Sequence, residues 1–412
     1  MKLFLICVLT GHFLWGWVLD RLNSRYINGK TDELDRVLPK SLLAHIDRGE
    51  YVKMVQYTEA KTRFGSFQSA VGLLVSILVI HFSLLRPIDL LVQDLPIYRI
   101  VFLLIVIVIG QVFEIPFDLY RVFVLEKRFG FNQTTPKVFV LDLLKSTAVS
   151  ICLLTPLLWL LFVLYDAAGS RWWIWGFMLF SGFQFLMLIL YPLLIAPLFN
   201  RFEPMQTGEL LDDIHVLTKK VCFPLQGVFV MDGSKHSRHS NAYFTGIGRS
   251  KRVVLYDTLV DALSNRELLA VLAHELGHYK LHHVKIQLSL TVVSSFIGFY
   301  LLNVLLGSEP FFQSMGYDGP AIHIGLILLM FFLSPIGMVL GPLANVLSRR
   351  FEYAADTFAN RAMGQTQSLT NALITLNKDN LSVPVVHPLY SFVHYSHPPL
   401  AERLLGMETK EP

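Results

Sequence analysis

The chain has 412 residues, of which 53% are hydrophobic and only 16% are charged, and its mean hydropathy is +0.50. This balance excludes an ordinary soluble protein and indicates a membrane protein. The formal net charge of +4 gives no reason to expect a nucleic-acid partner, because basic loops that face anionic lipid account for it.

Seven apolar segments are long enough to cross a hydrocarbon core about 30 Å thick. We predict spans at residues 3–19, 67–85, 100–119, 146–165, 172–195, 286–306 and 322–345. The first span could be a cleaved signal peptide, but its end lacks a pattern of small residues and its basic flank follows it, so we expect a retained anchor. Cys7, Cys152 and Cys222 are scattered and predict neither a disulfide framework nor a thiolate zinc site.

The positive charges predict the orientation of these spans. With seven spans, the segments 20–66, 120–145, 200–285 and 346–412 share one side of the membrane and hold 31 of the 35 Lys and Arg residues. By the positive-inside rule, that side is cytoplasmic and the N-terminus is outside.

The polar segment after the fifth span contains patterns that predict one helix followed by three strands. Residues 208–221 are typical of an amphipathic helix, and strands are predicted at 227–231, 241–246 and 252–256. Proteases often bind substrate as an added strand at a sheet edge, because backbone pairing orients any peptide. The strand at 241–246 is the natural candidate, although a purely structural strand is a fair alternative.

The next helix carries the main chemical motif, HELGH at residues 274–278. Ser264 and Glu267 form a capping box that predicts a helix start, and apolar residues at helical spacing carry the helix through the motif. His274 and His278 then lie on one face, where both imidazoles can bind one Zn²⁺, and Glu275 can act as a base toward a water molecule. The following His282 and His283 extend this helix, and we expect both to be solvated or interfacial.

A catalytic zinc site usually has three protein ligands. Glu352 and Asp356 lie four residues apart on a predicted helix, so one carboxylate can bind metal while the other holds a ligand imidazole. Taken alone, an exposed acidic face beside Arg349 and Arg350 is as good an interpretation. The upstream motif favours the metal site, and two spans between the halves place both on one side of the membrane.

Several segments together resemble a known family. They are YTEAKTRFG (57–65), EKRFGFN (126–132), NAYFTG (241–246), HELGHYKLHH (274–283), FEYAAD (351–356) and SHPP (396–399) with Arg403. Their combination and order resemble the sterile-24-type family, the type I CAAX prenyl endopeptidases, over nearly the whole chain.

The resemblance implies an all-α multispan membrane protein. Seven transmembrane helices would form a barrel around a water-filled chamber, closed by a cytoplasmic zinc metalloprotease domain with a small β-sheet. The expected division is 1–199 for helices one to five, 200–285 for the protease segment with the HExxH helix, 286–345 for helices six and seven, and 346–412 for the part with the third ligand.

The resemblance also implies roles for individual residues. His274, His278 and Glu352 would bind one zinc ion per chain, Glu275 would be the base, and Asp356 would hold a ligand. Asn241 and Ala242 would lie on the strand that binds substrate. His397 and Arg403 would lie near the scissile carbonyl, although without the resemblance Arg403 could pair with Glu402 or lipid phosphate.

The expected partners are membrane lipid and a peptide or protein substrate, which in this family is an isoprenylated C-terminal CAAX sequence. The expected location is the endoplasmic reticulum membrane in a eukaryote or the inner membrane in a bacterium. One alternative is a quality-control protease without prenyl specificity, the better expectation for a bacterial protein. A non-hydrolytic membrane scaffold is a weaker alternative, because it would need no base at Glu275, and a transporter would not need the polar metal segment.

Overall fold

The computed structural model describes residues 1–246 and 251–408, and it contains seven helices that are long and apolar enough to cross a membrane. They are α1 (Lys2–Gly29), α4 (Arg48–His81), α6 (Tyr98–Tyr120) with the π-helical η1 (Arg121–Glu126), α7 (Pro136–Ala167), α8 (Trp172–Leu190) with the π-helical η3 (Tyr191–Ile195) and α9 (Ala196–Phe199), α13 (His283–Leu306) and α15 (Ile322–Met363). The predicted number of spans is confirmed. Several helices extend beyond the ends of their predicted spans.

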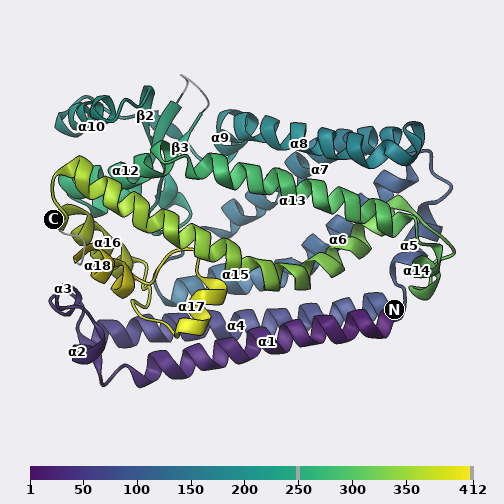
Figure 1. The fold of residues 1–412 in the computed structure, drawn as a ribbon, viewed down its shortest axis with the longest axis horizontal. Helices are drawn as coiled ribbons and strands as arrows, with labels where there is room; N and C mark the ends of the chain where they lie inside the picture. Colours follow the sequence, from purple (N-terminus) through teal and green to yellow (C-terminus); the bar gives the residue numbers. More distant parts are fainter. Residues whose placement is uncertain (247–250, 409–412) are drawn as a thin grey trace.

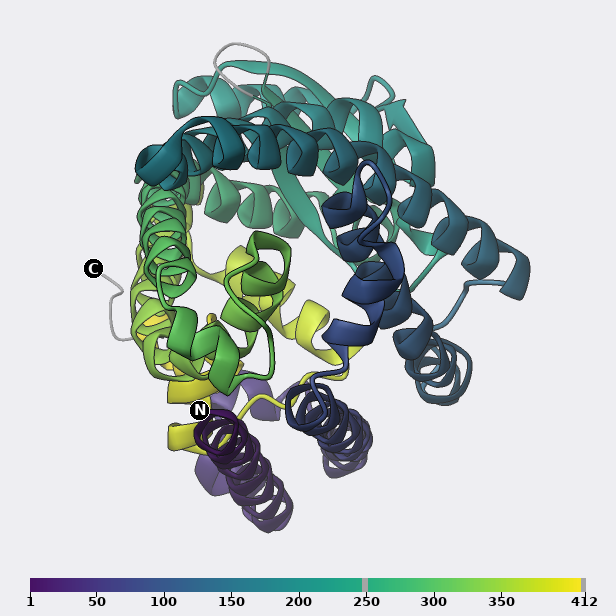
Figure 2. The same cartoon turned by 90° about the vertical axis from the view of Figure 1, so that its right-hand side faces the viewer.

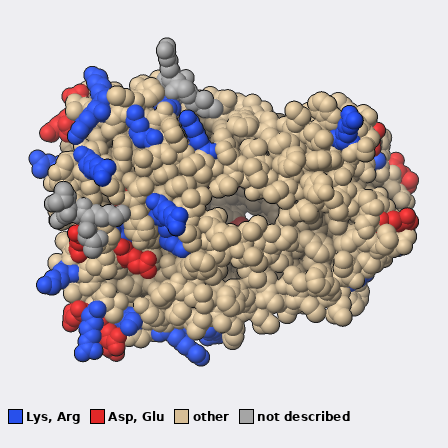
Figure 3. Space-filling model, in the orientation of Figure 1, with Lys and Arg blue, Asp and Glu red and all other residues tan. Residues whose placement is uncertain are grey.

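The long helices run side by side along the long axis of the molecule (Figure 1) and form a ring when viewed along that axis (Figure 2). In the space-filling view, an opening between α13 and α15 leads into a hollow interior (Figure 3). Only 6% to 22% of the apolar window of each spanning helix is buried inside the protein. The apolar side chains therefore face mainly outward or toward this interior, as in the expected barrel around a chamber.

Charged residues are concentrated at the two ends of the molecule, and a broad band between them is almost free of charge on the face shown in Figure 3. This is the distribution expected for helices that cross hydrocarbon, where a charge is costly. Most of the charge lies at the end that carries the sheet and the C-terminal helices.

A four-stranded sheet lies at that end. Its strands are β1 (Phe202–Pro204), β2 (Leu225–Met231), β3 (Ala242–Thr245) and β4 (Lys251–Tyr256), in the order β1-β2-β4-β3. β2 and β4 are parallel, whereas β1 and β3 pair antiparallel to their neighbours. The predicted amphipathic helix is α10 (Glu209–Lys220) and the three predicted strands are confirmed, but β1 was not predicted.

The remaining helices are short connections and the elements of the charged end. They are α2 (Leu34–Val37), α3 (Lys40–Leu43), α5 (Leu85–Val92), the 3-10 turns η2 (Gly169–Arg171) and η4 (Gly233–Lys235), α11 (Asp257–Ala262), α12 (Asn265–Lys280), α14 (Glu309–Ser314), α16 (Gln367–Asp379), α17 (Pro388–His394) and α18 (Leu400–Glu408).

The buried apolar side chains form two separate cores. One lies between the sheet, α12, α16 and the end of α15, with Leu255, Leu272 and Ala359 fully buried. The other joins the opposite ends of the spans around Phe102 and Phe312. Because the burial of apolar side chains stabilises both ends of the molecule, the helices are held together on either side of the hollow region.

One local prediction was wrong. The helix of the HELGH motif does not continue through His282 and His283, because α12 ends at Lys280 and His282 has a left-handed backbone with φ of 62°. The chain turns at this residue, and His283 begins α13.

Candidate metal centre

Helix α12 begins as its sequence predicts and presents the motif to the interior. At its start, the backbone N–H of Ser264 donates to Glu267 Oε2 at 2.9 Å. Leu268, Leu272 and Leu276 are buried in the core near the sheet. The apolar side of the helix is thereby fixed against the core, and the positions of His274 and His278 follow from it.

Helix α15 carries the acidic residues. The predicted helix under these residues is confirmed, and it is the continuation of the seventh span, since α15 runs unbroken over 42 residues. Glu352 and Asp356 are both buried, with relative exposures of 2% and 1%. A buried carboxylate is costly unless it is paired or bound to a metal, so both groups require partners.

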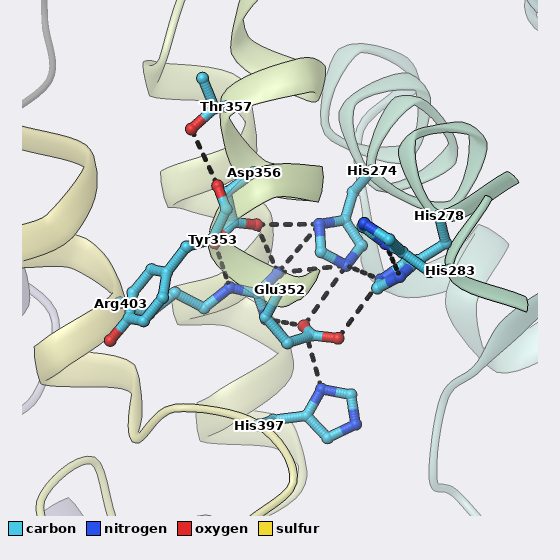
Figure 4. Close-up of polar contacts among 9 residues, drawn as sticks. All are labelled: His274, His278, His283, Glu352, Tyr353, Asp356, Thr357, His397 and Arg403. Carbon is cyan, nitrogen blue, oxygen red and sulfur yellow. Dashed lines mark hydrogen bonds and ion pairs between the residues drawn. The ribbon is translucent and has the colours of Figure 1, made fainter. Parts of the chain in front are cut away.

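The two imidazoles and Glu352 converge on one point (Figure 4). His274 Nε2 and His278 Nε2 are 3.1 Å apart, and the carboxylate oxygens of Glu352 lie 3.5 Å and 3.2 Å from them. One ligand atom from each residue lies within 4.8 Å of the others. Among the residues that the structure describes, no other group of His, Cys, Asp and Glu side chains meets this condition.

A glycine allows the two helices to approach so closely. A Cβ atom at Gly277 would lie 3.1 Å from the Cα and 3.3 Å from the Cβ of Ala355. These distances are shorter than nine in ten real Cβ contacts, so a side chain at 277 would require α12 and α15 to shift apart by a few tenths of an ångström. The small residue within the motif therefore determines the distance between the two imidazoles and Glu352.

Asp356 connects the metal centre to the C-terminal helix. Its Oδ1 lies 2.8 Å from His274 Nδ1, on the side of the ring opposite the convergence point. Arg403 of α18 donates to both carboxylate oxygens, from Nε at 2.7 Å and from Nη2 at 2.6 Å. Arg403 is itself 9% exposed, so the alternative of an outward pairing with Glu402 or lipid does not hold.

His397 approaches Glu352 from the open side of the site. Its Nδ1 lies 3.0 Å from Glu352 Oε2, and its side chain is 66% exposed. Figure 4 shows the imidazole on the side of Glu352 opposite Asp356. A side chain that is both exposed and within reach of the centre can also contact a bound peptide.

His283 is a site residue that the sequence interpretation missed. It was expected to be solvated or interfacial, but it is 5% exposed and its ring stacks on Phe351 with centroids 4.0 Å apart. Its Nδ1 lies 3.0 Å from His278 Nδ1. His282, in contrast, is exposed as expected. The turn at His282 produces this difference, and an unbroken helix would not have brought His283 back to the motif.

The surroundings shift the pKa of two residues in the HELGH motif. Burial raises the pKa of the Glu275 carboxyl, although the nearby His274 and His278 rings oppose this. Burial and the Arg403 guanidinium lower the pKa of His274, but the Asp356 and Glu352 carboxylates outweigh them and leave it raised. A carboxylate with a raised pKa is a better proton acceptor than an exposed one.

The proposed substrate strand lies beside the motif helix. β3 is at the edge of the sheet and contacts α12. Ala242 is the first residue of β3, and the preceding Asn241 is exposed, with its backbone oxygen accepting from Tyr256 N at 3.0 Å.

The donor set fits a metal ion. The two Nε2 atoms point at each other, an arrangement in which two lone pairs converge when neither nitrogen is protonated. Glu352 Oε2 is buried and lacks a hydrogen bond, although His274 Nε2 and the guanidinium Nη1 of Arg403 each lie 3.5 Å from it. Two imidazoles and one carboxylate form a common ligand set of catalytic zinc, which leaves a further position open. The barrel and this centre together define the class of membrane-embedded metallopeptidases.

Comparisons with known proteins identify the family within this class. Residues 30–201 match the family described as "CAAX prenyl protease N-terminal, five membrane helices". Residues 204–410 match peptidase family M48. The chain is 38% identical to the CAAX prenyl protease 1 homolog of Homo sapiens over 349 residues, which cover 75% of this chain and 73% of that protein. It is 34% identical to CAAX prenyl protease 1 of Saccharomyces cerevisiae, with 90% and 88% covered.

A solved structure agrees with this assignment. The crystal structure of S. mikatae Ste24p superposes with a TM-score of 0.90 at 32% sequence identity, and 98% of each chain is covered. The chain therefore belongs to the CAAX prenyl protease family of M48 metallopeptidases, as its resemblance implied. It is an integral multi-pass membrane metalloendopeptidase, and its family implies a bound metal ion and a peptide or protein substrate.

Proposed function

We propose that this protein is a zinc endopeptidase that cleaves isoprenylated C-terminal CAAX sequences at the cytoplasmic face of a membrane. The observation that carries the proposal is the convergence of His274, His278 and Glu352 within 4.8 Å, with Asp356 behind His274. The relatives named as CAAX prenyl proteases support the substrate class.

Zinc suits this set of ligands and, when bound, supplies Lewis-acid polarisation of a carbonyl and a lower pKa for a coordinated water. His274 and His278 would bind through Nε2, and Glu352 through its carboxylate. Asp356 would accept from His274 Nδ1–H and so hold the ring in the tautomer that leaves Nε2 free to bind. Arg403 would hold Asp356 and offset its buried charge.

The remaining residues would act on the peptide. Glu275 would take a proton from the attacking water and pass it to the leaving amine, for which its raised pKa is suited. His397 would donate to the carbonyl oxygen as negative charge develops there. Asn241 and Ala242 would pair with the substrate backbone at the edge of the sheet, since backbone bonds orient a peptide whatever its side chains.

The location follows from the charge distribution. Most basic residues lie on the side of the spans that holds the metal centre, so we place this side in the cytoplasm. In a eukaryotic cell, the expected membrane is that of the endoplasmic reticulum. We retain the division at residues 199, 285 and 345, with the metal centre assembled from the segments 200–285 and 346–412.

Cleavage of matched peptides tests this proposal. The purified full-length chain, with zinc restored, is given a CAAX peptide with and without a farnesyl thioether on its cysteine. We expect cleavage after the cysteine only in the prenylated peptide, and no cleavage by Glu275→Gln with either one. Equal cleavage of both peptides would favour a quality-control protease without prenyl specificity. Cleavage of neither by a zinc-loaded protein would contradict the proposed function.

A further inference from the structure

A groove of about 910 Å³ lies between α4 and the segment from the end of α6 to Phe129. Two sequence segments meet in it, 57–65 and 126–132, for which the metal centre gives no role. Ala60, Arg63, Phe64 and Phe67 line one wall at helical spacing along α4. Phe117, Tyr120, Val124 and Arg128 belong to the other wall.

The second wall has an irregular backbone. Pro116 lies within α6, and the helix widens into the π-helical η1 at Arg121–Glu126, which supplies Val124 and Leu125 to the groove. A proline removes one helical hydrogen bond and a π-turn inserts a residue, so the two helices do not pack along their full length. Such π-turns occur frequently at functional sites.

The groove changes character along its length. The part lined by the middle of α4 and the end of α6 is aromatic, and Phe67 is 60% and Tyr120 47% exposed. Toward the charged end of the molecule the lining becomes basic, with Arg63 and Arg128. The Arg63 side chain is 80% exposed, and Arg128 is exposed with its guanidinium 5.6 Å from the ring of Phe129.

One carboxylate, that of Glu59, also lines the groove and offsets one of the two arginine charges. Glu59 Oε2 pairs with Arg63 at 3.0 Å, while Oε1 accepts from Ser24 and Asn28 of α1. Arg128 has no acidic partner among residues 1–246 and 251–408. The groove therefore presents a net positive charge beside an apolar wall.

We propose that this groove binds one phospholipid with a net negative head group. The phosphate lies between Arg63 and Arg128, where guanidinium groups can donate paired hydrogen bonds, and one acyl chain lies against Phe67, Phe117 and Tyr120. Basic pockets between spanning helices at the charged face of a membrane bind anionic head groups in this way. An uncharged isoprenoid chain would make no use of the two arginines, so charge complementarity selects the phospholipid.

Lipid binding to the delipidated full-length protein tests the site. Native mass spectrometry would follow titration with phosphatidylserine and, separately, with phosphatidylcholine. Wild-type protein should retain one phosphatidylserine per chain more tightly than phosphatidylcholine. The double variant Arg63→Ala, Arg128→Ala should bind phosphatidylserine roughly 30-fold more weakly, the effect expected from two interfacial arginines.

Two further variants separate the site from general charge effects. The control Arg25→Ala, Lys137→Ala removes two exposed cations that do not line the groove and should bind as wild type does. Ala60→Trp fills the groove, keeps both arginines, and should also lose the lipid. The proposal would be overturned if the groove and control double variants bound phosphatidylserine equally, or if Ala60→Trp retained this lipid. Equal affinity of the wild-type protein for both lipids would also overturn it.

Discussion

His283 Nδ1 lies 3.0 Å from His278 Nδ1, so a residue outside the HELGH motif contacts an imidazole within it. If His278 binds metal through Nε2, its Nδ1 carries the ring proton. His283 Nδ1 must then accept a hydrogen bond from that N–H group. Stacking on Phe351 at 4.0 Å holds the His283 ring in place for this bond. His283 therefore positions a proposed ligand from the side opposite the metal.

The first prediction tests this contact. His283→Phe keeps a ring that can stack on Phe351 but removes the acceptor, so we expect zinc affinity to fall about 10–100-fold, as for other partners of metal-bound histidines. Competition with a chelator measures the affinity. His282→Asn is the control, because His282 is exposed and asparagine tolerates its left-handed backbone. Equal affinity of both variants would remove His283 from the site.

This contact also shows where sequence reasoning succeeds and fails. The spans and the α12 start were predictable because apolar length and capping chemistry are local signals. The convergence of His274 with Glu352 required only motif chemistry and an even number of spans. The reversal at His282 depends on a single left-handed residue, and Arg403 reaches Asp356 through tertiary packing, so neither leaves a local pattern. Strand β1 has only three residues, too few for an alternation to be recognised.

The second prediction concerns Glu275. Glu275→Gln preserves the shape of the side chain but cannot accept a proton, so zinc should be retained while kcat falls by about 10²–10⁴-fold. Metal content and peptide hydrolysis are measured on the same preparation. A zinc-loaded variant with near-normal turnover would show that another group acts as the base.

The third prediction concerns the Asp356–Arg403 pair. Removal of one partner of a buried ion pair leaves an uncompensated charge and typically costs about 3–5 kcal/mol. Asp356→Ala should therefore lower the free energy of unfolding by an amount in that range, and zinc affinity should fall because His274 loses its acceptor. Arg403→Met should also be destabilising but should weaken zinc binding less. Thermal unfolding and chelator competition provide the two readouts, and a zinc affinity unaffected by Asp356→Ala would contradict the role of Asp356.

The fourth prediction is a pH dependence at His239, which precedes the edge strand. Its interaction with Glu126 chiefly raises the pKa of His239, and the bond of Nδ1 to Asn380 Oδ1 at 2.6 Å adds to this against the effect of burial. Because the pKa of His239 is raised in the folded state, the stabilisation by its charged form is fully present at a pH below the unfolded-state pKa of about 6.5. This stabilisation is lost as the pH rises through the folded-state pKa.

His239→Gln should consequently lower Tm more at pH 6 than at pH 9, because the stabilisation by the charged imidazole decreases as the pH rises. His45→Gln, at an exposed histidine away from Glu126, serves as the matched control substitution. Melting curves at several pH values check this. A Tm difference for His239→Gln that is constant between pH 6 and pH 9 would show that its charge contributes nothing to stability.

The last prediction concerns His397, whose Nδ1 lies 3.0 Å from Glu352 Oε2 while its side chain is 66% exposed. Attack on a peptide carbonyl creates an oxyanion, and a donor already in place typically lowers the barrier by roughly 2.7–4 kcal/mol. Pro398 and Pro399 restrict the backbone beside His397, so the imidazole loses little freedom when substrate binds.

His397→Ala should therefore reduce kcat about 10²–10³-fold and change KM little, because the bond strengthens only as charge develops. Zinc content should remain normal, since His397 contacts the carboxylate and is not one of the three convergent donors. Steady-state kinetics on zinc-loaded protein separate this role from a structural one. A rise in KM at constant kcat would mean that His397 only binds substrate, and loss of zinc would mean that it helps to hold Glu352 in place.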